Sequence, residues 1–463
     1  MGTADPYRAT MASLSADQTA AISSFVYDWA ADEGVPGTSV AIVVDDELAF
    51  TAGIGSRDLA SNAPATPETL YGIGSVTKSF TALAIVQLAD RGSLELADPI
   101  TEYVPVAGLE DVSLHQLLTH SSGLPSLAVS EALIARRAGL GEAGVPLGDR
   151  EDFYHYLEGA VDEWTGTPAG RFMYANSGYM LLADVVEAVD GRPFATYVEE
   201  EILAPLGMER STFDAAAFAA DSDAMTPYEC GDDGPEARPL PVRELSHGPG
   251  GLLASVTELA NYLRLQLSDG TFEGTRLVSA DGLERMHGAH VETAEGPYGY
   301  GWRTREVAGE PLVGHSGSIG VSTAYVGFAP NAGVGVALAA NAAPGYALAH
   351  VGEALVAILL DEAPTEVVGF VRRRERFDVL TGSYETYRGV RSATIEAVGG
   401  ILQLTFEDAF AGEPIPLIPR AESADGYEWY TPAAGGERKP VQFVVDGDDV
   451  DCYVDRWRLH KRS

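Results

Sequence analysis

The segment Tyr71–Phe80, with the sequence YGIGSVTKSF, joins a glycine-containing stretch to an apolar run. The apolar residues continue to Leu88 and Gly92 is a suitable helix end, so the sequence predicts a mostly buried helix. Ser75 falls in its first turn and Lys78 follows three residues later, which places the hydroxyl and the amine on one helix face. A lysine whose pKa is lowered by burial can act as the base for a serine nucleophile. The alternative interpretation is a helix-capping serine followed by a solvated lysine.

The distribution of lysine supports the catalytic interpretation. Lysine occurs only at Lys78, Lys439 and Lys461, and arginine supplies all the other basic residues. The one lysine before the C-terminal region therefore lies on an apolar helix. Arginine stays protonated at any usable pH and could not serve as a base at this position.

The charge of the chain limits its partners. The sequence has 68 Asp and Glu against 30 Lys and Arg, which gives a net charge of −38. Such a surface repels nucleic acid and anionic membranes, so neither is an expected partner. Together with the scarcity of lysine, the acid excess predicts a halophilic protein, because about 1 M salt shortens the Debye length to about 3 Å. An ordinary acidic mesophilic protein is the alternative.

We expect neither export nor a membrane span. The N-terminal residues lack a basic stretch followed by an apolar one, and no segment offers roughly 18 uninterrupted apolar residues. The two cysteines, Cys230 and Cys452, lie far apart and imply no disulfide framework. These features predict a cytoplasmic location.

Length and hydrophobic pattern predict an α+β chain with more than one domain. At 463 residues the chain is too long for one ordinary core. Strand patterns bounded by turn residues occur at Ser39–Val44, Leu48–Ala52, Pro311–His315, Thr323–Phe328 and Val334–Ala340. The segment Glu229–Pro241, rich in glycine, proline and acidic residues, is expected to be a loop. Helices at both ends of this region predict an antiparallel sheet flanked by helices, with a helical subdomain inserted between its strands.

The pattern changes after residue 368. Leu402, Leu404 and Phe406 alternate with polar residues, as in a half-buried strand. Repeated short strands without helices predict a C-terminal antiparallel β-barrel in residues 369–463, following a first domain of residues 1–368. We interpret a run of arginines near the boundary as a linker or an inter-domain contact. The run consists of Arg372, Arg373, Arg374 and Arg376.

Two short motifs follow the SxxK of Ser75–Lys78, namely Tyr174-Ala-Asn176 and His315-Ser-Gly317. In this order and spacing, residues 15–360 resemble the serine β-lactamase and penicillin-binding-protein superfamily, and within it the class C-like branch. Supporting segments are LLTHSSGLP at Leu117–Pro125, PLGM at Pro205–Met208 and GPGGLLAS at Gly248–Ser255. The resemblance implies a serine hydrolase that forms an acyl-enzyme with a small-molecule or peptide substrate, without cofactor or metal.

The resemblance also implies roles for residues of the first two motifs. Ser75 would attack a carbonyl carbon and become acylated. Lys78 and Tyr174 would move the proton, and which of the two is the base stays open. Asn176 would orient Lys78 and bind the substrate amide.

The third motif supplies the remaining site residues. His315 and Gly317 would bind substrate, and the backbone N–H groups of Ser75 and Ser318 would form the oxyanion hole. β-Lactamases usually carry lysine where this chain has His315, which is largely neutral at pH 7, so an anionic β-lactam should be held less firmly. An HxG motif resembles D-aminopeptidases and related peptidases or esterases. Several of these carry a lipocalin-like C-terminal barrel that shapes the site entrance or the assembly, so a homo-oligomer is within expectation.

The alternatives to the hydrolase come from other functional classes. A sensor or binding protein on the same fold, acylated slowly and without turnover, is the alternative from a different class. A phosphate loop is rejected because Thr77 stands where a Walker A motif needs glycine before Lys78. His287 and His290 have no third ligand nearby in the sequence, so no metal site is expected. Whether the substrate is a D-peptide, an L-peptide, an ester or a β-lactam stays open.

Overall fold

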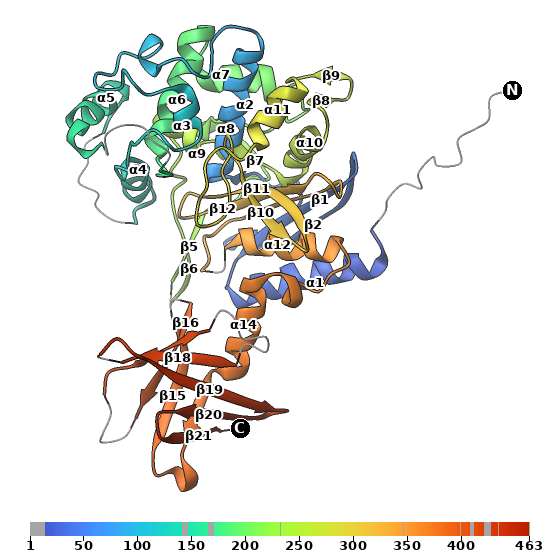
Figure 1. The fold of residues 1–463 in the computed structure, drawn as a ribbon. Coiled ribbons are helices and arrows are strands. Elements are labelled where there is room, and N and C mark those ends of the chain that lie inside the picture. Colours follow the sequence, from blue (N-terminus) through green and yellow to red (C-terminus); the bar gives the residue numbers. More distant parts are fainter. Residues whose placement is uncertain are drawn as a thin grey trace, which may run out of the picture. The chain divides into compact units, whose positions relative to one another are not determined.

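The computed structural model of the chain contains two compact units (Figure 1). The first spans Met1–Ala363 and the second Pro364–Ser463, so the division lies close to the predicted boundary after residue 368. The structure describes residues 14–140, 147–164, 171–231, 233–345, 347–398, 400–407, 412–420, 427–433 and 435–462.

A seven-stranded antiparallel sheet forms the centre of the first unit, in the order β10-β11-β12-β13-β1-β2-β3. The strands are β1 (Gly37–Val44), β2 (Glu47–Asp58), β3 (Ala63–Pro64), β10 (Arg303–Val307), β11 (Glu310–Ser318), β12 (Thr323–Ala329) and β13 (Val334–Ala340). The N-terminal hairpin completes the sheet, because Thr38 of β1 pairs with Ala340 of β13. Strands β12 and β13 are buried along their whole length, in keeping with their nearly continuous apolar sequence.

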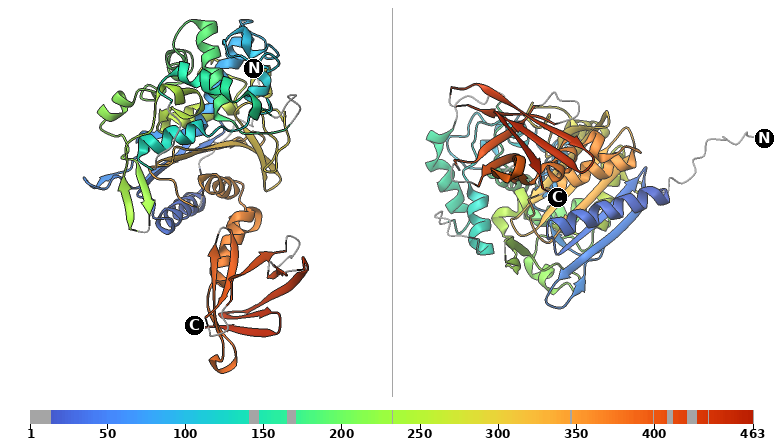
Figure 2. Two further views of the ribbon diagram at one scale, coloured as in Figure 1. Left: turned by 90° about the vertical axis from the view of Figure 1, so that its left-hand side faces the viewer. Right: turned by 90° about the horizontal axis from the view of Figure 1, so that it is seen from below.

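Helices cover both faces of this sheet. Helices α1 (Ala16–Asp32) and α12 (Leu348–Leu359) pack side by side on one face (Figures 1 and 2). Ser15 begins α1 with a capping box, in which its hydroxyl accepts from the Gln18 N–H and the Gln18 side chain accepts from the Ser15 N–H. On the other face α10 (Val256–Leu267) packs against β1, β12 and β13.

The remaining helices of the first unit form the subdomain around α2. They are α2 (Thr77–Asp90), α3 (Leu114–Leu118), α4 (Val129–Ala138), α5 (Arg150–Gly159), α6 (Asn176–Asp190), α7 (Phe194–Val198), α8 (Ala215–Ala220), α9 (His247–Gly250) and α11 (Ala280–His287). Short strands also pair here, namely β4 (Tyr71–Gly72) with β7 (Leu253–Ala254) and β8 (Thr271–Phe272) with β9 (Thr275–Arg276). Within the described ranges, no helix combines the length and the apolar character that crossing a membrane requires.

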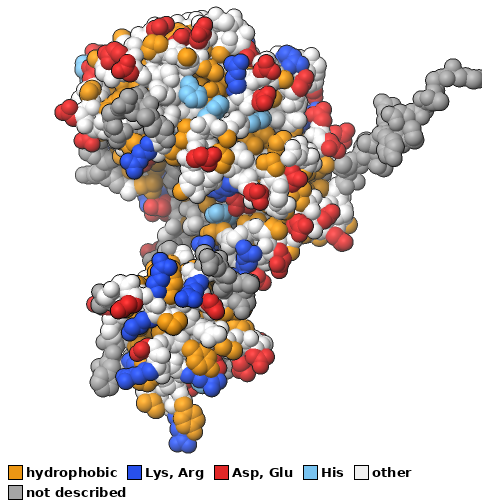
Figure 3. Space-filling model, in the orientation of Figure 1, with side chains coloured by type: hydrophobic (Ala, Val, Ile, Leu, Met, Phe, Trp, Pro, Cys, Tyr) orange, Lys and Arg blue, Asp and Glu red, His pale blue; other side chains and the backbone are white. Residues whose placement is uncertain are grey.

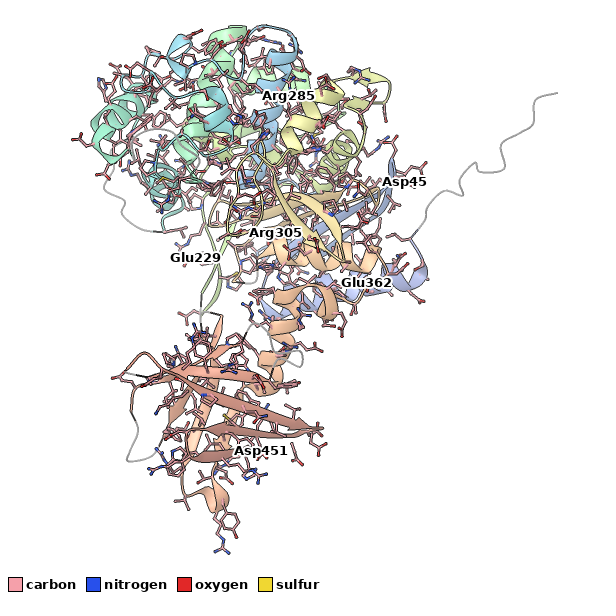
Figure 4. The ribbon with its side chains drawn as sticks, viewed as in Figure 1. Asp45, Glu229, Arg285, Arg305, Glu362 and Asp451 are labelled. Carbon is pink, nitrogen blue, oxygen red and sulfur yellow. The ribbon has the colours of Figure 1, made fainter. Side chains whose placement is uncertain are left out.

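The structure corrects the prediction of a loop at Glu229–Pro241. Strands β5 (Tyr228–Gly231) and β6 (Gly234–Ala237) form a hairpin within this segment. Glu229, labelled in Figure 4, forms an ion pair of 2.5 Å with Arg238 across the hairpin. Strand β6 is exposed along its length, so backbone pairing holds the ribbon without the apolar alternation that would have marked it in the sequence.

The second unit begins with helices α13 (Pro364–Val367) and α14 (Gly369–Leu380), followed by a closed eight-stranded barrel. The barrel strands are β14 (Gly382–Glu385), β15 (Ser392–Val398), β16 (Ile401–Phe406), β17 (Ile415–Pro419), β18 (Glu428–Pro432), β19 (Arg438–Asp446), β20 (Asp449–Val454) and β21 (Trp457–Lys461). Leu402 and Leu404 are fully buried, as their alternation predicted. The predicted fold class is therefore confirmed, and the arginine run lies within α14.

Candidate active site

Ser75 lies in a short 3-10 turn, Gly74–Val76, immediately before α2. The turn replaces the first α-helical turn predicted for this position, but the three-residue spacing to Lys78 still brings the two side chains together. The Lys78 amine is fully buried, and its Nζ lies 2.8 Å from Ser75 Oγ. Nζ also donates to Asn176 Oδ1 at 2.7 Å and to the Pro249 carbonyl oxygen at 2.8 Å. The sequence predicted the first two contacts, whereas the third comes from a backbone atom.

The environment of Lys78 favours the neutral amine. Burial lowers the pKa of Lys78 well below its usual range, and the negative charge of Glu131 opposes this only in part. A neutral amine has two N–H groups and one lone pair. The Asn176 and Pro249 oxygens act only as acceptors and take both N–H groups, which leaves the lone pair for the Ser75 hydroxyl.

Tyr174 precedes α6 and lies over the same amine, with Lys78 Nζ 4.7 Å from the centre of its ring. Burial raises the pKa of Tyr174 above its usual value, although a hydrogen bond with Ser75 and the charge of Arg303 oppose the rise. The phenol therefore keeps its proton at neutral pH. In this geometry Tyr174 can donate a proton, and Lys78 is the better acceptor.

The third motif runs along β11 beside Ser75. Gly317 approaches the turn so closely that an added Cβ would lie 2.0 Å from the Ile73 carbonyl oxygen and 2.6 Å from the Ser75 nitrogen. Gly74 in the turn approaches β11 equally closely, because an added Cβ would lie 2.5 Å from the Ser318 nitrogen. Its φ is +52°. Only glycine fits either position. Two residues without side chains thus bring the backbone of Ser75 next to that of Ser318.

His315 is buried and held at both ring nitrogens. Its Nδ1 donates to the Ser316 carbonyl oxygen at 2.6 Å, so its Nε2 accepts from the Tyr298 hydroxyl at 3.2 Å. Burial, with the neighbouring Lys78 as the second cause, lowers the pKa of His315 to about 3. His315 is therefore neutral and cannot act as the fixed cation that a lysine would supply.

A cavity of about 630 Å³ opens over these groups, and it adds charged residues that sequence reasoning missed. Ser75, Tyr174, Asn176, His315, Gly317 and Ser318 all line it. Its further charged lining residues are Glu131, Glu295, Arg303 and Arg305, the last labelled in Figure 4. In a chain with 68 acidic residues, no sequence signal separates Glu131 or Glu295 from the solvated majority.

His120 is a further residue without a predicted role, although it belongs to the THSSGLP segment. Its carbonyl oxygen accepts from the Met173 N–H at 2.8 Å, and its Nδ1 accepts from the Ala175 N–H at 3.2 Å. Its ring packs 4.3 Å from the ring of Tyr174. His120 thus fixes the backbone on both sides of Tyr174 and is a positioning residue for the second motif.

The side chains of His287 and His290 have separate hydrogen-bond partners. Nε2 of His287 bonds to Gln266 Oε1 and Nε2 of His290 to the Arg285 carbonyl oxygen, so the pair does not share a ligand position. Among the residues that the structure describes, no group of three His, Cys, Asp or Glu side chains is arranged to hold a metal ion.

Solved structures of known proteins share this architecture. The chain is 34% identical to the octameric penicillin-binding protein homologue from Pyrococcus abyssi, with a TM-score of 0.89, and the match covers 96% of this chain and 100% of that one. A class C beta-lactamase from Rhodobacter sphaeroides is 18% identical with a TM-score of 0.61 over 73% of this chain and 99% of that one, which shows a common fold.

The curated relatives match a smaller part of the chain. The chain is 28% identical to Protein flp of Staphylococcus aureus over 314 residues, which cover 66% of this chain and 60% of the relative. It is 27% identical to Penicillin-binding protein 4 of Amycolatopsis lactamdurans over 330 residues, which cover 66% of this chain and 81% of the relative. The chain thus spans less than two thirds of the length of the Staphylococcus proteins.

Two family models match the chain, one in each unit. Residues 364–460 match the description Pab87 octamerisation domain. Residues 12–361 match the description Beta-lactamase, which covers the whole sheet and every predicted site residue. These matches confirm the resemblance predicted from the three motifs: the chain belongs to the beta-lactamase family.

Proposed function

We propose that the protein is a serine hydrolase that cleaves amide or ester bonds through an acyl-enzyme on Ser75. The observation that carries the proposal is the 2.8 Å contact between the Ser75 hydroxyl and a fully buried amine whose pKa lies well below its usual range. A solvated lysine would be protonated at neutral pH and could not accept the serine proton. Membership of the beta-lactamase family supports the same chemistry.

The proposed reaction uses the site residues in turn. The Ser75 proton passes to Lys78 Nζ while Oγ forms a bond with the carbonyl carbon, and the Ser75 and Ser318 N–H groups stabilise the oxyanion. The bond to the leaving group then breaks as that group takes a proton delivered by Lys78 or Tyr174. Water attacks the acyl carbon as Lys78 takes one of its protons. The bond from that carbon to Ser75 Oγ then breaks, Oγ recovers the proton from Lys78, and the carboxylic acid leaves.

The neutral His315 supports peptidase or esterase activity over β-lactamase activity. A β-lactam carries a carboxylate that a fixed cation would hold, and His315, with a pKa of about 3, carries no charge at neutral pH. Arg303 and Arg305 lie in the same cavity, but both form ion pairs with Glu295. The preferred substrates of this proposal are therefore peptides, amino-acid amides or esters.

The test is a covalent label followed by a substrate panel. A fluorophosphonate should add one mass equivalent per chain, on the peptide that contains Ser75, and p-nitrophenyl esters or D- and L-amino-acid p-nitroanilides should then be turned over. Label without turnover on any member of the panel, nitrocefin included, would favour the sensor function. No label at Ser75 would contradict the nucleophile assignment.

We also propose, from the net charge of −38, that the protein works in a salt-rich cytoplasm. Carboxylates crowded on one surface repel each other, and salt screens this repulsion. The charge is uneven, since residues 364–463 contain 17 acidic and 13 basic residues, while residues 1–363 contain 51 and 17. On the face shown in Figure 3, basic side chains are accordingly frequent on the second unit.

We propose further that the second unit joins copies of this chain into a homo-oligomer. The matched octamerisation domain and the octameric relative support this assignment. Two neighbouring apolar residues in the turn between β14 and β15, Tyr387 and Val390, are 75% and 78% exposed. The turn is held by hydrogen bonds from the Gly389 N–H to the Thr386 carbonyl oxygen and from the Thr386 N–H to the Arg391 carbonyl oxygen. An ordered turn with two exposed apolar side chains, on a unit less acidic than the rest of the chain, suits contact with a second copy.

Replacing Tyr387 and Val390 together by serine should therefore lower the mass of the assembly. Light scattering should give a multiple of 48.9 kDa for the wild type and a smaller multiple for the double variant. Tyr27→Ser, which removes a 62% exposed tyrosine from α1, serves as the matched control and should keep the wild-type mass. An unchanged mass in the double variant would exclude this turn from the interface.

A further inference from the structure

The cavity over Ser75 extends beyond the reacting groups. Its volume of about 630 Å³ lies in the range of about 300–1,000 Å³ in which pockets enclose a ligand of drug size. One part is lined by α4 and another by β11, β12 and the start of α12, and α4 and α12 lie well apart in Figure 1. The cavity therefore has room for more of a substrate than the group that is transferred. We call its second part the α12 end, and its residues are Leu312, Gly314, Tyr325, Ala347 and Leu348.

Tyr325 is held at the α12 end by three glycines. An added Cβ on Gly314 or Gly327 would lie 2.5 or 2.4 Å from the Tyr325 hydroxyl oxygen. One on Gly352 of α12 would lie 2.2 Å from the tyrosine ring. The sheet and α12 therefore leave room for the phenol only because these three positions lack a Cβ. Tyr325 is 4% exposed, so its side chain is fixed by packing on both sides.

The Tyr325 hydroxyl is available to a ligand. Among the residues that the structure describes it has no hydrogen-bond partner, although Tyr325 lines the cavity. Burial raises the pKa of Tyr325, so the hydroxyl keeps its proton and can donate it in a hydrogen bond. A buried donor without an acceptor is unfavourable relative to the same donor in water, and a carbonyl oxygen of a bound ligand would restore the bond.

The charged residues beside Tyr325 neutralise one another. Arg305 forms ion pairs with Glu295 and with the buried Glu353 of α12. Glu295 also pairs with Arg303, so two guanidinium groups face two carboxylates. A charged ligand group would gain no free partner here, and the other side chains of the α12 end are apolar. This part of the cavity suits an uncharged apolar group that carries a carbonyl oxygen, as a peptide residue does.

Strand β11 sets the order of the groups in the cavity. Gly314 lies against the Tyr325 hydroxyl, and four residues later the Ser318 N–H is the proposed oxyanion donor. Between them, the His315 ring lies 6.2 Å from the ring of Tyr174, a proposed proton donor to the leaving group. A leaving group lies beside its proton donor, so the α12 end is on the leaving-group side. A rise of about 3.3 Å per residue makes the distance along the strand roughly 13 Å, the length of three to four residues of extended peptide.

We propose that Tyr325 binds the leaving-group side of a peptide substrate, by donating its hydroxyl to a backbone carbonyl oxygen of the third or fourth residue beyond the scissile bond. The site then prefers peptides with uncharged apolar residues at these positions over single amino-acid amides and simple esters. The inference rests on the proposed hydrolase function and names the extent of its substrate. A p-nitrophenyl ester or p-nitroanilide has no group that reaches Tyr325.

The wild-type test is a series of peptides that share one acyl residue and differ in the leaving group, which has one to four alanine residues and ends in an amide. The acyl residue is the one that the p-nitroanilide panel shows to be turned over fastest. We expect kcat/KM to rise by about tenfold or more between one and four alanines, with most of the rise at the third or fourth. Equal values along the series would overturn the inference.

Variants then locate the preference. Tyr325→Phe should lower the ratio of kcat/KM for four alanines to that for one alanine by about threefold to tenfold, because it removes the hydroxyl and keeps the ring. The matched control is Tyr262→Phe, which also removes the hydroxyl of a fully buried tyrosine, on α10 and outside this cavity. The control should keep the wild-type ratio. An unchanged ratio in Tyr325→Phe, or an equal fall in both variants, contradicts the assignment.

Two further results test the chemistry and the direction. Aspartate or lysine in place of the third and fourth alanine should remove the gain, and an undiminished gain would contradict the preference for uncharged residues. A slower deacylation in Tyr325→Phe would place this residue on the acyl side, because the leaving group has gone by that step, and would contradict the direction. Fluorophosphonate labelling of Ser75 separates the two proposals. Label and turnover without any effect of length would contradict the role of Tyr325 alone, whereas absence of label would contradict the hydrolase itself.

Discussion

Ser75→Ala is expected to abolish acylation and to lower hydrolysis by about 10⁴-fold or more, because the variant has no atom to form the acyl bond. The fold should persist, since the hydroxyl lies at the cavity surface and the turn around it is fixed by Gly74 and Gly317. Burst kinetics with p-nitrophenyl acetate and intact-mass measurement of the fluorophosphonate adduct check both statements.

Ser79→Ala is the matched control for this variant. Ser79 lies on the same helix, is fully buried, and donates to the Val76 carbonyl oxygen at 2.8 Å. Losing that bond should lower the free energy of unfolding by about 1 kcal/mol and leave the burst amplitude intact. A burst in Ser75→Ala as large as that of Ser79→Ala would assign the nucleophile elsewhere.

Lys78→Arg is the second variant with a large expected effect, a loss of about 10³-fold in kcat. A guanidinium stays protonated, so it cannot accept the Ser75 proton, and general-base catalysis typically contributes about 10²–10⁴-fold. The variant also places a permanent charge where the wild type has a fully buried side chain, so some of it is expected to unfold.

Lys78→Met separates loss of the base from loss of the fold. Methionine leaves no buried charge and should fold, yet it should be about as inactive as the arginine variant. Near-normal kcat in Lys78→Met would transfer the base role to Tyr174.

In the wild type, kcat/KM should rise with pH through the lowered pKa of Lys78, because only the neutral amine accepts a proton.

The parts of the site that depend on local spacing could be predicted from the sequence. Ser75 and Lys78 meet because three residues span one helical turn, and this held even though the turn is a 3-10 turn before α2. Alternating or continuous apolar residues likewise located the main strands of the sheet. The resemblance to a known family supplied Tyr174, Asn176 and the third motif, which no local pattern would join to Ser75.

Contacts made by backbone atoms across long sequence separations could not be predicted. The Pro249 carbonyl oxygen accepts from Lys78 across 171 residues, and every residue type carries such an oxygen. His120 contacts the backbone on both sides of Tyr174 while its own φ is positive, at 54°. Its partners are the backbone N–H groups of Met173 and Ala175, which lie far from it in the sequence. The hairpin of β5 and β6 was not predicted because strand β6 is exposed along its length and its sequence carries no apolar alternation.

The pairing of β1 with β13 delays completion of the sheet while the chain is being synthesised. Thr38 finds its partner Ala340 only after about 300 further residues, which takes about 15–60 s at the usual rate of translation. During that interval the nascent hairpin has one apolar edge open to other chains. Ser318 is also made late, so the nucleophile at residue 75 lacks its proposed oxyanion donor until the sheet is nearly complete. The growing chain is therefore expected to be inert toward substrate, and activity should begin only when the first unit closes.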